Sequence, residues 1–341
     1  MVQASQDEET NPLLKPGTTT ASATSSAAPA AASGDRTADL WAFFRGEMVP
    51  LRDARVSVMT HAFNYGTAVF EGIRAYWNPE QGQLWALDLI PHFERLKASG
   101  RFLFMEVPYT AEQLAAKTIE VLRRDGLRED VYVRPLIYKS NETIGVRLHN
   151  LDADVVIFGV PFGQYIDTEG GIRAQVSTWR RTDDNAIPAR GKITGAYVNG
   201  ALAKSEAQLN GFDEAIVLTQ DGHVSEGSAE NLFIAKGGVL ITPPVTDNIL
   251  EGITRGRLMH VARERLELVV QERTIDRTEL YNADEVFLCG TGAQISPVVE
   301  IDRRQIGSGR PGPITRQLSD VYFQAVRGGI DAYRDWLTPV Y

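Results

Sequence analysis

The chain has 341 residues, 43% of them hydrophobic and 23% charged, with a formal net charge of -9. This composition is typical of a soluble globular protein, and the length predicts two domains. The acidic balance argues against nucleic-acid binding, because phosphate contacts require a basic surface, and the sequence lacks the apolar run of about 18 residues that a membrane span needs.

The N-terminal segment differs in composition from the rest of the chain. Residues 10–36 are rich in Thr, Ser, Ala and Gly, so they can bury little apolar surface and we expect residues 1–36 to be disordered. Early acidic residues without an apolar run argue against a secretory signal, and the absence of arginine before Arg36 argues against an organelle transit peptide. With a single cysteine, Cys289, no internal disulfide can form, which fits a cytoplasmic location.

The first half then combines strands with a few helices, which predicts a small α+β domain over residues 37–160. Apolar and polar residues alternate around Gly46, as in a hairpin. Capping and periodicity predict helices at 91–100 and 111–124, and β-rich runs predict strands at 131–139 and 154–162. Pro161 and three glycines then predict an interdomain linker at 161–171.

The second half, residues 172–341, is expected to form a larger domain. A strand near 173–179 precedes a helix that ends at Gly211, and Asp-Gly and Gly-Gly turns indicate two hairpins. Two more helices are expected, at 254–266 and at 313–327. The strands are predicted to pair as hairpins and not as βαβ units.

Common motifs of other enzyme classes are missing or misleading. Gly307, Gly309 and Gly312 match G-x-G-x-x-G, but two prolines interrupt the motif, so we expect a turn and no dinucleotide site. The histidines never pair at metal-ligand spacing, so no metal is expected. No P-loop, G-x-S-x-G or H-E-x-x-H motif is present.

Lys192 is the candidate for covalent chemistry, in the segment Ile-Pro-Ala-Arg-Gly-Lys-Ile-Thr-Gly. The flanking Gly191 and Gly195 would allow a ligand to approach the backbone closely, and Tyr197 supplies a nearby phenol. A buried lysine can form a Schiff base with a carbonyl compound. An average lysine in a loop is simply solvated, so Lys192 needs partners to support this interpretation.

A pyridoxal phosphate enzyme requires such a lysine, an acid against the pyridine nitrogen and an anion site for the phosphate. Glu226 and Glu230 lie among small residues and could supply the acid, although exposed turn carboxylates would look the same. Gly252, Ile253 and Thr254 begin a predicted helix with free N–H groups, and Thr291 lies in a second Gly-rich turn. For the phosphate, spacing alone leaves three arginines open: Arg74, Arg95 and Arg190.

Seven sequence blocks, in order and in register, together resemble branched-chain amino acid aminotransferases. These blocks are FNYGTAVFEGIRAYW, HFERL, VYVRPLI, IPARGKITGAYVNG, VSEGSAENLF, LEGITR and CGTGAQISPV, and the resemblance extends from about residue 38 to about residue 328. The family belongs to the class IV, fold type IV pyridoxal phosphate enzymes. The resemblance implies a small α/β domain and a larger domain with a mostly antiparallel, barrel-like sheet and flanking helices.

The resemblance also implies a role for each matching residue. Lys192 would bind the cofactor and move the proton, with Glu226 on the pyridine nitrogen, Tyr197 on the ring oxygen, and the phosphate held by Arg95, Ile253, Thr254 and Thr291. The substrate carboxylate would lie against Tyr132 and the Thr291–Gly292 backbone, and its side chain against Phe70, Tyr165 and Tyr197. Arg134, with Tyr65 of a second subunit, would bind the distal carboxylate of glutamate or 2-oxoglutarate.

The implied reaction is reversible amino transfer from L-Leu, L-Ile or L-Val to 2-oxoglutarate. The implied assembly is a homodimer or a higher homo-oligomer in which Tyr65 and Val146 act across the interface. Two alternatives stay open: another class IV reaction (a D-amino acid or (R)-amine transaminase, or an aminodeoxychorismate lyase) and a non-catalytic ligand-binding protein. The loop NETIGVRLHNLDAD and the Arg-Gly-Lys-Ile-Thr-Gly segment depart from the family pattern, which leaves the substrate preference open.

Overall fold

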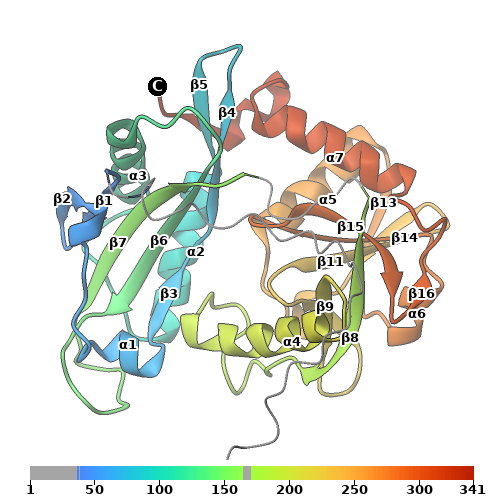
Figure 1. Ribbon diagram of the computed structural model, residues 1–341, viewed down its shortest axis with the longest axis horizontal. Coiled ribbons are helices and arrows are strands. Elements are labelled where there is room, and N and C mark those ends of the chain that lie inside the picture. The colour runs from blue at the N-terminus through green and yellow to red at the C-terminus, as the bar shows by residue number, and fades with distance from the viewer. Residues whose placement is uncertain (1–36, 38, 164–169) are drawn as a thin grey trace, which may run out of the picture.

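The computed structural model describes residue 37 and residues 39–163 and 170–341. Two β-sheets lie side by side, with helices packed on each and a cavity between them (Figure 1). The predicted disorder of residues 1–36 and the predicted substrate contact of Tyr165 lie outside the described residues. Among the helices described, none is long and apolar enough to cross a membrane.

The first sheet has eight strands in the order β17-β5-β4-β6-β7-β1-β2, with β3 paired to β6. Helices α2 (Leu89–Phe102) and α3 (Ala111–Asp125) contribute leucines to its core, and the short α1 (His61–Tyr65) precedes β3. Its strand pairs are antiparallel throughout the described residues. The strands are β1 (Trp41–Phe44), β2 (Glu47–Pro50), β3 (Ala68–Phe70), β4 (Ile73–Asn78), β5 (Gln83–Leu87), β6 (Val131–Lys139), β7 (Ala153–Pro161) and β17 (Leu337–Pro339).

Local sequence signals account for these elements. Thr110 and Gln113 form a reciprocal capping box at the start of α3, and Gly126 ends the helix in the left-handed region. The predicted hairpin around Gly46 is β1–β2. Helix α2 begins two residues before Pro91, which therefore occupies its first turn, where a missing N–H has no cost.

The second sheet has nine strands in the order β10-β9-β8-β15-β14-β11-β12-β13, with β16 paired to β15. Its helices are α4 (Tyr197–Leu209), α5 (Ile253–Arg265), α6 (Arg277–Tyr281) and α7 (Pro313–Val326). The strands are β8 (Ile172–Arg180), β9 (Glu214–Leu218), β10 (Val224–Gly227), β11 (Asn231–Lys236), β12 (Val239–Thr242), β13 (Val269–Glu272), β14 (Glu285–Gly290), β15 (Gln294–Ile301) and β16 (Arg304–Gln305).

The expectation that this half contains only hairpins is wrong. Strands β8 and β9 are parallel and are joined through α4, and β12 and β13 are parallel and are joined through α5. A parallel pair needs a crossover connection, which a helix of 13 residues provides. The other described pairs are mostly antiparallel, so the sheet remains mixed with an antiparallel majority.

The chain passes from the first sheet to the second between β7 and β8, within the predicted linker 161–171. We retain the two-domain division at this point as a proposal. One strand does not follow the predicted boundary, because β17 returns to pair with β5 in the first sheet. The C-terminal end of the predicted large domain therefore contributes to the small one.

The glycines at 307, 309 and 312 form a turn, as expected. Gly307 and Gly309 have positive φ angles of 51° and 71°, and α7 begins directly after Gly312. The carboxylate of Glu285 accepts hydrogen bonds from the backbone N–H groups of Ile314 and Thr315 at 2.9 and 2.8 Å. A side-chain anion thus already occupies the N-terminus where a dinucleotide phosphate would bind.

The lysine segment is attached to the first sheet through its backbone. Phe70 N–H donates to the carbonyl of Lys192 at 3.0 Å, and Lys192 N–H donates to Ser99 Oγ of α2 at 3.1 Å. Gly195 N–H donates to the carbonyl of Gly66 at 3.1 Å. The Thr194 hydroxyl donates to the same carbonyl at 2.7 Å. The two glycine backbones meet so closely that a Cβ on Gly66 would lie 2.8 Å from Gly195 Cα.

We predict that Gly66→Ala destabilises the protein more than Gly126→Ala does. Both positions have left-handed φ angles, of 65° and 63°, but a Cβ on Gly126 meets nothing within 4 Å. Gly126→Ala should therefore cost only the conformational term of about 1 kcal/mol, and Gly66→Ala should cost about 2 kcal/mol more through overpacking. Urea unfolding measures both, and equal losses would contradict the close contact between Gly66 and Gly195.

Candidate active site

A cavity of about 740 Å³ lies between the two sheets. Most of the predicted site residues line it: Phe70, Arg95, Tyr132, Arg134, Lys192, Tyr197, Glu226, Ile253, Thr254, Thr291 and Gly292. Tyr65 and Val146 do not line it within one chain. Their predicted role across a subunit interface remains a prediction.

The amine of Lys192 lies inside this cavity between two aromatic rings. Nζ donates to the Tyr197 hydroxyl at 2.6 Å and lies 5.0 Å from the centre of the Phe70 ring. Burial lowers the pKa of the amine, but Tyr197 and Glu71 oppose this effect and the net shift is upward. The protonated amine is therefore favoured, and Tyr197 is the hydrogen-bond acceptor that holds it.

The carboxylate of Glu226, on β10, faces the same cavity, where it already accepts two hydrogen bonds and forms one ion pair. Arg181 Nη2 reaches Oε1 at 2.8 Å. Asn231 Nδ2 and Leu250 N–H reach Oε2 at 3.0 and 3.1 Å. A carboxylate offers about four acceptor positions, so one position on Oε1 is left, which fits the N–H of a protonated pyridine ring. Burial raises the pKa of Glu226, and the Arg181 charge opposes that rise.

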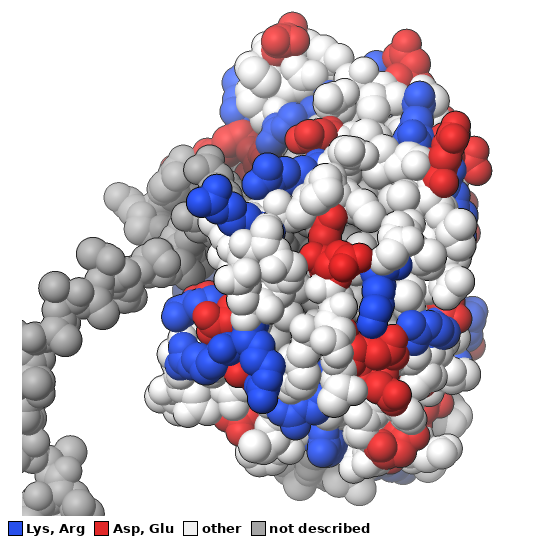
Figure 2. All heavy atoms as spheres, turned by 90° about the vertical axis from the view of Figure 1, so that its right-hand side faces the viewer, with Lys and Arg blue, Asp and Glu red and all other residues white. Residues whose placement is uncertain are grey.

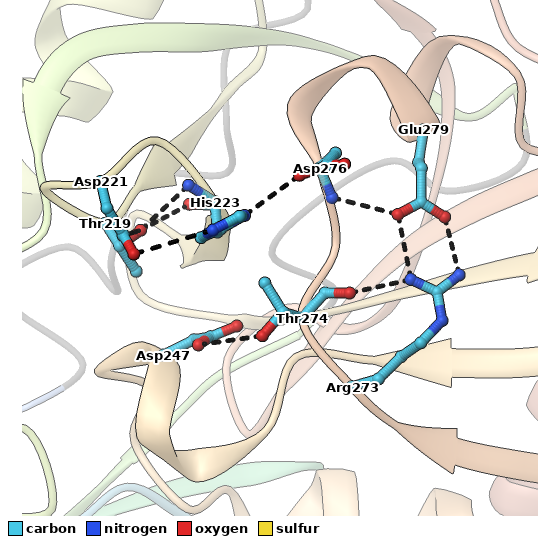
Figure 3. A network of polar contacts seen from close by, with 8 residues as sticks. All are labelled: Thr219, Asp221, His223, Asp247, Arg273, Thr274, Asp276 and Glu279. Atoms are coloured by element: carbon cyan, nitrogen blue, oxygen red, sulfur yellow. Dashed lines mark hydrogen bonds and ion pairs between the residues drawn. The ribbon is translucent and has the colours of Figure 1, made fainter.

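A polar network joins the turn that precedes β10 to residues 273–279 and to Asp247 (Figure 3). His223 Nδ1 contacts Asp276 Oδ1 at 3.1 Å, and Thr274 donates to Asp247 Oδ1 at 3.4 Å. The Asp247 carbonyl accepts the Ser225 hydroxyl at 2.7 Å. Residue 247 ends the 3-10 turn η3 (Val245–Asp247), three residues before the backbone N–H of Leu250 that binds Glu226. The network thus fixes the strand that carries Glu226 relative to one of its donors.

Two arginines from the first half of the chain, Arg74 and Arg95, contact the predicted phosphate site. Arg95 on α2 donates through Nη1 to the carbonyl of Glu251 at 2.6 Å, just before α5 begins. The first N–H groups of α5, at Ile253 and Thr254, have no partner within the helix and favour an anion. Arg74 Nε donates to the carbonyl of Thr291 at 3.2 Å. Because C=O and N–H point in opposite directions across a trans peptide, the Gly292 N–H is directed away from Arg74.

Strand alternation places the predicted substrate residues on one face of the first sheet. Tyr132 and Arg134 are two apart on β6, and Arg134 Nη2 donates to the Tyr132 hydroxyl at 3.0 Å. Phe158 and Val160 lie opposite them on β7 and also line the cavity. Nothing in the sequence alone marks this apolar pair, because strand register is needed to see that β7 faces the site.

Arg134 has the environment expected of a residue that binds a carboxylate ligand. Its guanidinium lies 4.5 Å from the centre of the Phe70 ring, and its Nε is buried without a hydrogen-bond partner. Within residues 39–163 and 170–341, no carboxylate pairs with it. A partly buried cation without an anion is costly unless a ligand supplies one.

The two acids proposed from sequence occupy different environments. Glu230 also borders the cavity, but its Oε2 accepts the Ala229 N–H at 3.0 Å. Burial, with the buried carboxylate of Glu214 nearby, raises the pKa of Glu230 to about 8. Glu230 is therefore neutral at pH 7, and Glu226, which has an arginine partner, is the better partner for a cationic ring. Arg190, left open earlier as a phosphate ligand, is half-exposed and pairs with Asp184 and Glu251.

The donor set fits pyridoxal 5′-phosphate. One wall supplies an amine, the opposite wall supplies a carboxylate with one acceptor position left, and a third supplies an arginine and a helix N-terminus. A Cβ on Gly252 would lie 1.9 Å from Asn231 Oδ1, so only glycine lets this amide pack against the backbone at the helix start. Asn231 and Arg181 were not predicted, and no local pattern in the sequence distinguishes them.

Comparison with known proteins places this fold and cavity in a class. The family model described as amino-transferase class IV matches residues 68–301. The chain therefore belongs to the class IV aminotransferase family. It is 54% identical, over 88% of its length and 97% of the relative, to a probable branched-chain-amino-acid aminotransferase of Aquifex aeolicus.

Two solved structures share the fold over nearly their whole length. The branched-chain aminotransferase of Thermoproteus uzoniensis, crystallised with norvaline, is 44% identical with a TM-score of 0.85, covering 89% of this chain and 99% of that one. The branched-chain amino acid aminotransferase of Thermobaculum terrenum, in its PLP-bound holo-form, is 39% identical with a TM-score of 0.86 at the same coverage. These structures confirm the predicted α+β fold of type IV.

Proposed function

We propose that this chain transfers the amino group of L-Leu, L-Ile or L-Val to 2-oxoglutarate, reversibly and with pyridoxal 5′-phosphate as cofactor. It is a branched-chain amino acid aminotransferase, as are the relatives to which it is similar. The observation that carries the proposal is a cavity lined by a lysine, by an acid that is paired with an arginine, and by a second arginine that is partly buried without a carboxylate partner. We also propose a cytoplasmic location, which its single, unpaired cysteine supports.

When bound, the cofactor supplies an electron-withdrawing ring that stabilises negative charge at the substrate Cα. Lys192 would hold the cofactor through Nζ and, as a free amine, would take the proton from the substrate Cα. Tyr197 keeps Nζ in place through its 2.6 Å hydrogen bond. Glu226 holds the ring nitrogen in its protonated form, and Arg95 with the start of α5 binds the phosphate.

One pocket must accept both an apolar side chain and a carboxylate. Phe70, Phe158 and Val160 provide apolar surface for Leu, Ile or Val. Arg134 lies at the same pocket and pairs with the distal carboxylate of 2-oxoglutarate through charge-assisted hydrogen bonds. Tyr132 and the Gly292 N–H bind the α-carboxylate that all these substrates share.

A spectral half-reaction screen tests the substrate class. We expect L-Leu to remove the absorbance of the lysine-bound cofactor rapidly, and D-Ala and an (R)-amine to leave it nearly unchanged. Lys192→Ala should lack this absorbance and all turnover, since no other lysine lines the cavity in the described part of the chain. A faster reaction with D-Ala or the (R)-amine would identify a different class IV transaminase, and pyruvate release from aminodeoxychorismate would identify a lyase.

Arg134→Gln should separate the two substrate types. We expect kcat/KM for 2-oxoglutarate to fall about 100-fold, since the loss of charge-assisted hydrogen bonds costs roughly 3 kcal/mol, and kcat/KM for the 2-oxo acid of leucine to fall far less. The matched control is Arg190→Gln, which removes an exposed charge paired with Asp184 and Glu251. Equal losses with both oxo acids would argue against a role in carboxylate recognition.

We further propose that two copies of the chain pair across an apolar surface formed by α1 and the loops beside it. Exposed side chains gather there, with Val58 74%, Phe63 69%, Ile144 64% and Val146 78% accessible. The loop that carries Val146 is fixed, because the Gly145 N–H donates to the Tyr65 hydroxyl and its carbonyl contacts His61 Nε2. By contrast, the face at the right of Figure 1 carries basic and acidic side chains interspersed (Figure 2).

Val146→Asp should convert the dimer to a monomer, because a buried carboxylate without a partner opposes association. The control is Val269→Asp, which changes an exposed valine (59% accessible) on β13. Light scattering coupled to size-exclusion chromatography gives the mass of each variant. A monomeric wild-type chain, or a dimeric Val146→Asp variant, would refute this surface.

A further inference from the structure

The carboxylate of Glu71, buried next to the cavity, has no role in the mechanism above. Glu71 stands between Phe70 and Gly72, which both line the cavity, but its own side chain is fully buried on the other side. Its backbone N–H donates to the carbonyl of Pro135 on β6 at 2.9 Å. The first sheet therefore fixes the backbone that carries this carboxylate.

Both oxygens of Glu71 bind Arg95. Arg95 Nε lies 2.7 Å from Oε1 and Nη2 lies 2.7 Å from Oε2, so the pair is bidentate. His92 Nδ1 lies 2.8 Å from the same Oε2, and His92 is 3% exposed. His92 and Arg95 are three residues apart on α2, which places them on one face of the helix and lets both reach Glu71.

These contacts decide which N–H groups of Arg95 remain for a ligand. A guanidinium has five N–H donors in one plane. Two of them point at Glu71, and one on Nη1 points at the carbonyl of Glu251 at 2.6 Å. Within the described residues this leaves one N–H on each terminal nitrogen, both on a residue that lines the cavity.

We propose that Glu71, oriented by His92, is the positioning residue that turns this pair of N–H groups toward the cofactor phosphate. The inference rests on the proposed cofactor and deepens it. Arg95 binds the phosphate, and Glu71 and His92 act through Arg95 without touching the ligand. Because the guanidinium is planar and the carboxylate holds one edge, the other edge cannot rotate away from the phosphate.

The protonation of the cluster agrees with this assignment. Burial alone would raise the pKa of Glu71, but the charge and hydrogen bonds of Arg95, followed by those of His92, lower it to about 2. Glu71 is thus an anion at neutral pH and can only accept hydrogen bonds. The proton between it and His92 therefore belongs to Nδ1.

Electrostatics and positioning predict opposite results for Glu71→Gln. Removing a negative charge near the phosphate should by Coulomb's law tighten phosphate binding. Losing the bidentate partner of Arg95 should weaken it, because the amide nitrogen of glutamine cannot accept a hydrogen bond. Weaker phosphate binding in Glu71→Gln would therefore indicate that Glu71 positions Arg95, whereas tighter binding would indicate that Glu71 acts only as a nearby negative charge.

The experiment measures dissociation constants of pyridoxal 5′-phosphate and of pyridoxal, which lacks the phosphate, by absorbance titration of the cofactor-stripped full chain. We use the dissociation constant of pyridoxal divided by that of pyridoxal 5′-phosphate. This ratio is large when the phosphate strengthens binding, and a general loosening of the site, which weakens both ligands, does not change it. We expect Glu71→Gln and His92→Ala to reduce this ratio about 10-fold or more, as the loss of a charge-assisted contact does. His92→Asn keeps an N–H near the position of Nδ1 and should restore most of the ratio.

Glu120→Gln is the control for net charge, because Glu120 lies on the surface of α3 and pairs only with Lys117 and Arg124 among the described ion pairs. It should leave the ratio unchanged. An unchanged or increased ratio in Glu71→Gln would overturn the proposal, and if that variant does not fold, equal ratios in His92→Ala and wild type would do so. A wild-type chain that does not bind pyridoxal 5′-phosphate would instead refute the proposed function.

Discussion

The active site depends on the hydrogen bonds that attach the backbone of Lys192 to the first sheet. Its carbonyl is held by Phe70 of β3 and its N–H by Ser99 of α2, whereas Glu226 belongs to the second sheet. The Lys192 amine and the Glu226 carboxylate can therefore face each other only if the two sheets keep a fixed position relative to each other. Arg74 and Arg95, from the first half of the chain, hold the two sheets together. Arg74 donates to the carbonyl of Thr291 and Arg95 donates to the carbonyl of Glu251, both in the second half.

The arginines in and around the cavity differ in whether a carboxylate of the protein balances their charge. Arg74 is 1% exposed, and it donates to the carbonyls of Thr291, Phe162 and Gly163, which carry no full negative charge. Arg134 has a hydroxyl partner and two aromatic faces. Buried positive charge that the protein does not neutralise creates a field that a ligand carboxylate or phosphate can satisfy. Arg95 differs, since Glu71 neutralises it in part and fixes its orientation.

The sequence predicted well what depends on local rules. The apolar periodicity that ends at Gly126 located α3, and the glycine turns located hairpins, within a few residues. Most of the site residues that the family resemblance implied line the cavity. Contacts between distant residues were not predicted: Arg181 reaches Glu226, Phe158 lies opposite Arg134, and Glu71 meets Arg95 only after folding. The parallel pairs around α4 and α5 were missed because hairpin turns elsewhere in the second half suggested a uniform pattern.

The return of β17 to the first sheet has a consequence for how the chain is made. Leu337–Pro339 pair with β5, and the Gln83 side chain accepts the N–H groups of Val340 and Tyr341 at 3.0 and 2.8 Å. During synthesis the strands β1 to β7 leave the ribosome first, yet the edge at β5 is covered only after β17 has emerged. An uncovered strand edge can pair with other chains. Translation through Leu337–Pro339 is thus part of the folding of the first sheet, and nascent chains that stall before β17 carry an open edge.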